Sequence, residues 1–216
     1  MKKIYCITGL GADHRFFGKL HIAGYDLVPV PWVKAGDTDT LPSYAMKMYE
    51  AMHEPAPVII GLSFGGMLAT EIKKQVPAAT VILVSSAKTI DEIGYDNFLF
   101  KAISRTGVIP ESWFVTPFPF ILDLLGAETE GEKSEFRQMM ASGDPYFVKW
   151  CVNAILHWEN HVVPTGIFHI HGTVDKVIWP TWVHPDIWVQ GGSHIMIYNR
   201  AEEVAAHILR YLNGQA

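Results

Sequence analysis

The 216-residue sequence contains only two cysteines, Cys6 and Cys151, and it lacks any long apolar run. Two distant cysteines do not make the disulfide framework of a small secreted domain, and neither has a partner at metal-binding spacing. We interpret both as buried apolar residues in a reducing compartment. No stretch reaches 18 apolar residues, which predicts no membrane-spanning helix. The first apolar run is too short for a signal peptide, so we expect a cytoplasmic protein.

Basic residues are too few to favour nucleic-acid binding. The 17 lysines and arginines are outnumbered by 22 aspartates and glutamates, which gives a formal net charge of -5. A chain with that charge offers no positive field for a phosphate backbone. Its composition, 49% hydrophobic and 18% charged, is typical of a globular domain rather than of a disordered segment. The length predicts a single domain, and nothing in the composition indicates its oligomeric state.

Strand-like and helix-like segments alternate along most of the chain. Short apolar runs predict strands over Ile4–Thr8, Tyr25–Val30, Pro57–Gly61, Ala79–Ser85, Gly166–His171 and Asp186–Gln190. Helical patterns are found over Asp13–Leu20, Pro42–His53, Gly66–Gln75 and Ala201–Leu212. This alternation predicts an α/β fold with a doubly wound, mostly or fully parallel, six-stranded sheet.

The alternation is interrupted between residues 88 and 162, which contain no convincing strand. This segment is rich in large apolar side chains, more than its few helices need for their own packing. We therefore expect a core formed by residues 1–87 and 163–216, with the insert as a movable helical cap. Trp113, Phe114 and Phe118 are our candidates for the wall of a substrate pocket.

The sharpest motif is the segment Gly61-Leu62-Ser63-Phe64-Gly65, which is followed by Gly66. It has the form G-x-S-x-G and stands between a predicted strand and a predicted helix. A nucleophile on such a sharp turn has a strained backbone, and its neighbours must be small so that strand and helix can approach. The three glycines fulfil that need, so we predict that Ser63 is a nucleophile.

A serine nucleophile needs a base and a group that orients the base. His194 follows the last predicted strand, and Asp175 follows the strand before it, in the segment His171-Gly172-Thr173-Val174-Asp175. The predicted catalytic residues are therefore Ser63, Asp175 and His194, in that chain order. Asp91, which follows the fourth strand, is an alternative source of the carboxylate.

With these motifs in this order, nearly the whole chain resembles the α/β-hydrolase superfamily. The resemblance implies that Ile4–Thr8 corresponds to the family's third strand, so that its first two strands are absent. It also implies an oxyanion hole made by the backbone N–H groups of Leu10 and Phe64. Many relatives have His-Gly where this chain has Thr8-Gly9, which leaves open how the oxyanion loop is braced.

Three other patterns point to different sites. Gly9-Leu10-Gly11 could begin a dinucleotide-binding fingerprint, but no glycine occupies the third position. His169 and His171 resemble a metal-binding H-x-H pair, for which a packed or loop-bonded role is the simpler interpretation. His157 and His161 have a spacing that zinc can use, yet no third ligand is evident. We expect neither a metal nor an organic cofactor.

The sequence thus predicts a serine hydrolase that cleaves a small or medium apolar carboxylic ester or thioester through an acyl-enzyme. Its expected partner is the small acyl substrate. Two alternatives stay open: a ligand-binding or signalling protein that retains the triad with little turnover, and a carbon–carbon bond hydrolase or acyltransferase using the same residues.

Overall fold

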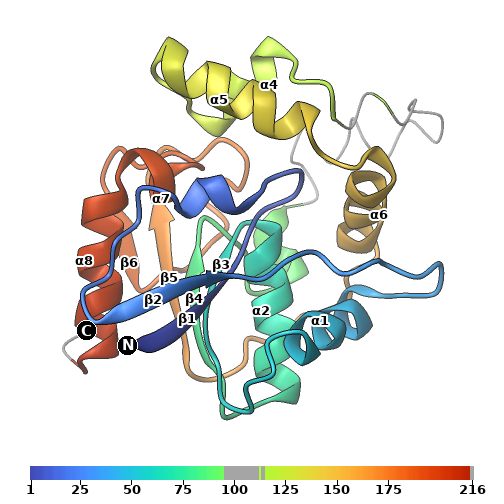
Figure 1. Cartoon of the computed structure of the whole chain (residues 1–216), viewed down its shortest axis with the longest axis vertical. Helices are drawn as coiled ribbons and strands as arrows, with labels where there is room; N and C mark the ends of the chain where they lie inside the picture. The colour runs from blue at the N-terminus through green and yellow to red at the C-terminus, as the bar shows by residue number, and fades with distance from the viewer. Residues whose placement is uncertain (95–111, 113–114, 215–216) are drawn as a thin grey trace.

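The computed structural model describes residues 1–94, 112 and 115–214, and within these ranges six strands form one sheet (Figure 1). The strands are β1 (Lys2–Ile7), β2 (Tyr25–Pro29), β3 (Val58–Leu62), β4 (Thr80–Val84), β5 (Ile167–Gly172) and β6 (Ile187–Val189). Their order across the sheet is β2-β1-β3-β4-β5-β6, and every neighbouring pair is parallel. The predicted α/β fold with a fully parallel sheet is confirmed.

Successive side chains of the central strands point into two different hydrophobic cores. Ile59 packs with α1 (Leu41–Glu50) and α2 (Phe64–Gln75) on one face, and Ile60 packs with α8 (Ala201–Leu212) on the other. Figure 1 shows these helices on opposite sides of the sheet. Because both isoleucines are fully buried, the strands read as continuous apolar runs, as parallel strands covered on both faces do.

Two short helices differ from the prediction. The segment Asp13–Leu20 forms only one 3-10 turn, η1 (His14–Phe17), which ends at Gly18, a residue that disfavours the helix interior. A further short helix, α7 (Met196–Asn199), follows the His194 loop and was not predicted. The last helix has the bounds expected from the sequence.

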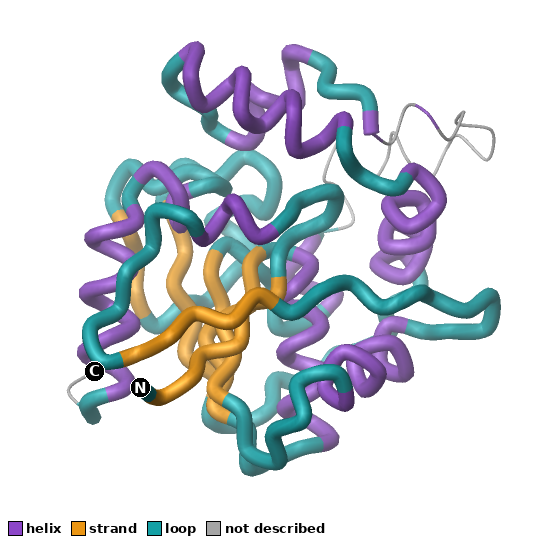
Figure 2. Tube along the Cα trace, in the orientation of Figure 1, coloured by secondary structure: helices purple, strands orange, loops and turns teal. Residues whose placement is uncertain are grey.

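The described part of the segment between β4 and β5 consists of helices joined by loops and contains no strand. It contains η2 (Ile90–Ile93), α4 (Pro119–Leu125), α5 (Glu130–Ala141) and α6 (Pro145–Leu156). Helices α4 and α5 lie beyond the carboxyl ends of the strands (Figure 2). Phe136 of α5 is fully buried and stacks on Phe16, whereas Cys151 of α6 joins the core on the α1 and α2 side. The described part of this segment is therefore anchored to both faces of the core.

The two cysteines lie in the two hydrophobic cores, Cys151 in one and Cys6 in the other. Cys6 and Cys151 are both buried and free, and burial raises the pKa of Cys6 to about 12 and that of Cys151 well above its ordinary value. Neither thiol is therefore disposed to ionise near neutral pH. None of the described helices combines the length and the apolar character that crossing a membrane requires.

Candidate active site

Ser63 occupies the sharp turn that joins β3 to α2. Its backbone angles are φ 52° and ψ -119°, a left-handed conformation that costs a non-glycine residue about 1–3 kcal/mol. Two hydrogen bonds hold it there. The Ser63 N–H donates to the carbonyl of Val84 at 3.1 Å, and the hydroxyl of Ser86 donates to the carbonyl of Ser63 at 2.6 Å. Strand β4 and its following loop therefore fix the turn from one side.

The glycines around Ser63 are required by close packing. A Cβ atom on Gly61 would lie 2.5 Å from the carbonyl oxygen of Gly65, and one on Gly65 would lie 2.3 Å from that of Ile7. A Cβ on Gly66 would lie 2.3 Å from the Oγ of Ser86. Such distances lie well inside van der Waals contact, so any larger residue would push strand and helix apart.

His194 lies within hydrogen-bonding distance of both Ser63 and Asp175. Its Nδ1 is 2.8 Å from the Oδ2 of Asp175, and its Nε2 is 3.0 Å from the Oγ of Ser63. A carboxylate only accepts, so Nδ1 carries the hydrogen and Nε2 is left to accept from the serine hydroxyl. The fold thus brings the three predicted side chains, from loops after β3, β5 and β6, into one hydrogen-bonded chain.

The carboxylate of Asp175 is buried but well supplied with donors. Its Oδ1 accepts the backbone N–H groups of Val177 at 2.8 Å and Ile178 at 3.0 Å, while Oδ2 faces His194. Burial alone would raise the pKa of this carboxyl. The imidazoles of His194 and His171 and the N–H of Ile178 outweigh that effect, so the pKa lies below its ordinary value. Asp175 is therefore ionised at neutral pH.

The loop after β1 passes directly beside Ser63. A Cβ atom on Gly9 would lie 3.2 Å from the Cβ of Ser63, which sets how closely this loop can approach. Within the described residues, neither the N–H of Leu10 nor that of Phe64 donates to a backbone carbonyl. Phe64 is the first residue of α2, where the helix itself leaves N–H groups unpaired.

The bracing of this loop, which the sequence left open, comes from two side chains. The hydroxyl of Thr8 donates to the carbonyl of Ala12 at 3.1 Å, and the indole N–H of Trp32 donates to the same carbonyl at 3.3 Å. The N–H of Ala12 in turn donates to the carbonyl of Gly9 at 3.1 Å. These three bonds close the turn without the histidine that many relatives have.

Three other candidates from the sequence, Asp91, His157 and His161, have hydrogen-bond partners outside the group of Ser63, His194 and Asp175. Asp91 is in η2, where its Oδ2 is 2.9 Å from the Nδ1 of His161 and both side chains are more than half exposed. The Nδ1 of His157 lies 2.9 Å from the carbonyl of Asn153. Among the described residues, no three His, Cys, Asp or Glu side chains are arranged to hold a metal ion.

Two neighbours of the site were not predicted from the sequence. The Ser86 hydroxyl holds the turn at Ser63, and no local pattern distinguishes it from an ordinary loop serine. His171 is fully buried with its Nε2 3.5 Å from the Oδ2 of Asp175. The sequence favoured a packed or loop-bonded role over a metal site for the His169 and His171 pair, but it did not indicate a place beside Asp175. The position of His171 directly before the Gly-x-x-Asp segment was the available signal.

A pocket of about 730 Å³ adjoins the loop after β1. One wall consists of Gly11, Ala12 and Asp13, a second of residues 32–37, and a third of side chains near the junction of α5 and α6. Trp32 links this pocket to the turn at Ser63, since its ring lies 6.1 Å from that of Phe64 and 5.0 Å from that of Phe147. Neither Ser63 nor His194 is among the lining residues.

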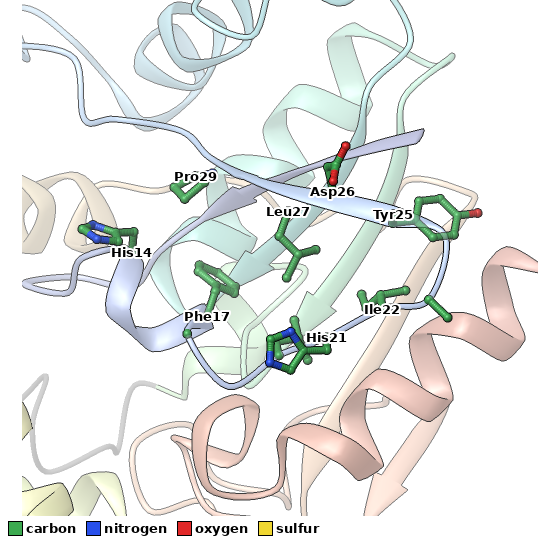
Figure 3. A pocket seen from close by; sticks show the side chains of 11 residues that line it. His14, Phe17, His21, Ile22, Tyr25, Asp26, Leu27 and Pro29 are labelled. Atoms are coloured by element: carbon green, nitrogen blue, oxygen red, sulfur yellow. The ribbon is translucent and has the colours of Figure 1, made fainter. Parts of the chain in front are cut away.

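A second pocket, of about 570 Å³, lies between η1 and the edge strand β2, where Phe17, Ile22 and Leu27 line it (Figure 3). Of the residues predicted to line a substrate pocket, Phe118 is the one that the structure describes, and it lines neither of these two pockets. Trp113 and Phe114 lie outside the described residues. Phe118 directly precedes α4 and stacks on Phe120 with ring centres 5.9 Å apart.

A family model provides the decisive comparison, because it matches residues 7–207, nearly the whole chain, and describes the alpha/beta hydrolase family. The chain belongs to the alpha/beta hydrolase family. The comparison of this sequence with curated proteins found no significant match.

Solved structures agree with this assignment at the level of the fold. An esterase from Exiguobacterium antarcticum superimposes with a TM-score of 0.75 at 14% identity, covering 99% of this chain and 92% of its own. A thermophilic esterase from Thermogutta terrifontis gives 0.70 at 13% identity, covering 100% and 90%. An N-acyl homoserine lactonase, solved with N-butanoyl homoserine, gives 0.69 at 15% identity, also covering 100% and 90%.

Proposed function

We propose that this alpha/beta hydrolase family member is a serine hydrolase of small or medium apolar carboxylic esters or thioesters. The observation that carries the proposal is the hydrogen-bonded chain from Ser63 through His194 to Asp175, with Ser63 on a strained turn. Strain at such a position persists only where the surroundings enforce it, and nucleophile turns are where it is functionally used.

In the proposed reaction, the Oγ of Ser63 attacks the acyl carbonyl while the Nε2 of His194 takes its proton. The N–H groups of Leu10 and Phe64 donate to the oxyanion that forms. When the tetrahedral intermediate collapses, His194 gives its proton to the leaving alcohol or thiol. Water then attacks the acyl-enzyme by the same route and restores Ser63. Asp175 keeps the imidazole in the required tautomer and stabilises its protonated form.

The pocket beside the oxyanion loop supports the substrate class. Its volume of about 730 Å³ lies within the range of small-molecule sites, and Trp32, Phe147 and Trp150 give it aromatic walls. We propose that it receives the apolar part of the substrate and that residues 88–162 act as the cap over the site. The esterases and the lactonase of similar fold add linear and cyclic esters to the substrates worth testing.

The test combines labelling with turnover. A fluorophosphonate should label the protein once, on Ser63, as mapped by mass spectrometry, and a panel of p-nitrophenyl esters, thioesters and a lactone should show hydrolysis. Ser63→Ala should lower kcat on the order of 10⁴-fold or more, because only the nucleophile is lost. Ser134→Ala, an exposed serine on α5, is the matched control and should react normally.

Two outcomes would contradict the proposal. A Ser63→Ala protein that keeps more than about a tenth of the wild-type activity would remove Ser63 from the reaction. Labelling of Ser63 without turnover of any ester, thioester or lactone would instead favour the triad-retaining ligand-binding alternative.

A further inference from the structure

Asp175 lies between two imidazoles, of which the proposed reaction uses only one. His171, in the fully buried last part of β5, has its Nε2 3.5 Å from the Oδ2 of Asp175, the oxygen that also faces His194. We propose that His171 is a positioning residue that fixes the Asp175 turn and so aims Oδ2 at His194. This inference rests on the proposed function, because it assigns His171 a part in that same reaction.

The hydrogen bonding of His171 defines its tautomer. Its Nε2 lies 3.0 Å from the carbonyl oxygen of Ile178. A carbonyl oxygen only accepts, so Nε2 must carry a hydrogen. The other ring nitrogen, Nδ1, is buried and has no hydrogen-bond partner within the described part of the chain. A second hydrogen on Nδ1 would therefore be an unpaired buried donor, which proteins avoid. His171 is thus a neutral donor directed at Ile178.

Ile178 joins His171 to Asp175 through both of its backbone polar groups. Its carbonyl accepts from His171, and its N–H donates to the Oδ1 of Asp175 at 3.0 Å. The N–H of Val177 donates to the same Oδ1 at 2.8 Å. The backbone of this turn therefore occupies Oδ1 and leaves Oδ2 for His194. At 3.5 Å, His171 is too far from Oδ2 to compete with His194 by a hydrogen bond of its own.

The surroundings keep His171 neutral while His194 gains and loses its proton. The titratable groups that face it are Asp175 from the turn, His194 from its loop and His169 from β5, whose ring centre lies 5.3 Å away. Trp188 of β6 packs perpendicular to the ring at 6.0 Å. Burial lowers the pKa of His171 more than the Asp175 carboxylate raises it. A second cation beside Asp175 is thereby avoided during turnover.

The neighbouring histidine offers a matched control. His169 lies two residues earlier on the same strand, is equally buried, and packs against the ring of His171. Its ring nitrogens make no hydrogen bond to the Asp175 turn. Replacing His169 by phenylalanine therefore disturbs the same core without removing a donor from that turn. A purely structural role for His171 would make the two phenylalanine variants equivalent.

The experiment compares His171→Phe, His171→Gln and His169→Phe with the wild type. For a p-nitrophenyl ester, kcat and KM are measured between pH 5 and pH 9, at a temperature where circular dichroism shows all four proteins folded. His171→Phe should lower kcat by about 10- to 100-fold with little change in KM, because the Asp175 carboxylate is misaligned. The acid limb of the kcat/KM profile should move to lower pH, because a misaligned Asp175 supports protonated His194 less well.

His171→Gln retains an amide N–H at the position of Nε2 and should recover most of kcat and the wild-type profile. His169→Phe should leave both unchanged. A second readout does not depend on turnover: the low-field ¹H NMR signal of the hydrogen between His194 and Asp175 should be shifted or lost only in His171→Phe. If His171→Phe does not fold, His171→Gln is compared with His171→Asn instead. Only glutamine places its N–H at the position of Nε2.

The inference is overturned if His171→Phe keeps the wild-type kcat, pH profile and NMR signal, or if His169→Phe changes them equally. It is also overturned if glutamine is no better than phenylalanine, or no better than asparagine in the replacement pair. Failure of the proposed function is a separate outcome, because the wild type would then neither turn over esters nor depend on Ser63. The NMR comparison would still decide whether His171 positions Asp175.

Discussion

A methyl group added at Gly126 would lie 2.3 Å from the Cβ of Ser193, the residue directly before His194. Gly126 ends α4 in a left-handed conformation with φ 84°. The contact is reinforced on both sides, since the N–H of Ile195 donates to the carbonyl of Leu125 at 3.3 Å and the Asn199 amide donates to that of Gly126 at 3.3 Å. The end of α4 is thus bound to the loop that carries His194.

This contact predicts that Gly126→Ala lowers both activity and stability. The added methyl group must displace Ser193, and alanine disfavours the positive φ, so kcat should fall by about 10-fold or more and stability by about 1–3 kcal/mol. Gly131→Ala is the control, because the nearest atom to its new methyl group is 3.8 Å away. Ester kinetics and urea unfolding measure both effects. An unchanged kcat in Gly126→Ala would show that α4 does not hold the His194 loop.

Substituting the two candidate acids should separate their roles. Asp175→Asn should lower kcat by about 10³- to 10⁴-fold, because the amide no longer fixes the tautomer of His194. Asp91→Asn should leave kcat within about twofold, since its exposed pair with His161 contributes at most about 1 kcal/mol. Both variants are assayed on one activated ester. A larger loss from the Asp91 change would transfer the acid role to that residue.

Stability should decrease as the pH falls below about 6.5, the ordinary pKa of histidine. Burial lowers the pKa of both His169 and His171 in the native protein, so the unfolded chain binds protons in this range that the native protein does not. Their contribution to the free energy of unfolding is complete above the histidine pKa of the unfolded chain. Below that pKa, each histidine lowers the free energy of unfolding by up to about 1.4 kcal/mol per pH unit. The lowered pKa of Asp175 adds a further loss below about pH 4.

Urea unfolding at pH 8 and pH 5.5 checks this dependence. His169→Phe should unfold with a smaller difference between the two pH values than the wild type, whatever its absolute stability. If both proteins lose the same free energy of unfolding, the buried histidines are not the cause of the acid sensitivity.

Acyl preference should depend on the pocket of about 730 Å³ beside the loop after β1. Phe147→Ala removes one of its aromatic walls and should lower the ratio of kcat/KM for a hexanoyl over an acetyl ester by about tenfold, with little change for the acetyl ester. Phe118→Ala, the same substitution at a residue that does not line this pocket, is the comparison. A larger change in the ratio from Phe118→Ala would place the acyl group on the α4 side instead.

Local patterns in the sequence were sufficient to predict the strands along the chain and the sharp turn at Ser63. Apolar runs such as Ile59–Ile60 predict buried parallel strands because both faces of the sheet are covered. At Gly61, Gly65 and Gly66, any Cβ atom would clash with backbone or with Ser86. This steric requirement can therefore be recognised in the sequence as three glycines around Ser63. Only short elements such as η1 and α7 differ, since one turn leaves no periodic signal.

The meeting of Ser63, His194 and Asp175 was decided by the tertiary structure. The sequence left Asp91 as a rival carboxylate, and only the fold directs it to the exposed His161 while Asp175 reaches His194 at 2.8 Å. The hydrogen bond of His171 to Ile178 joins residues that lie 7 positions apart, and the contact of Gly126 with Ser193 joins residues that lie 67 positions apart. Such contacts depend on how strands and loops pack in three dimensions, and packing leaves no periodic or spacing signal along the chain.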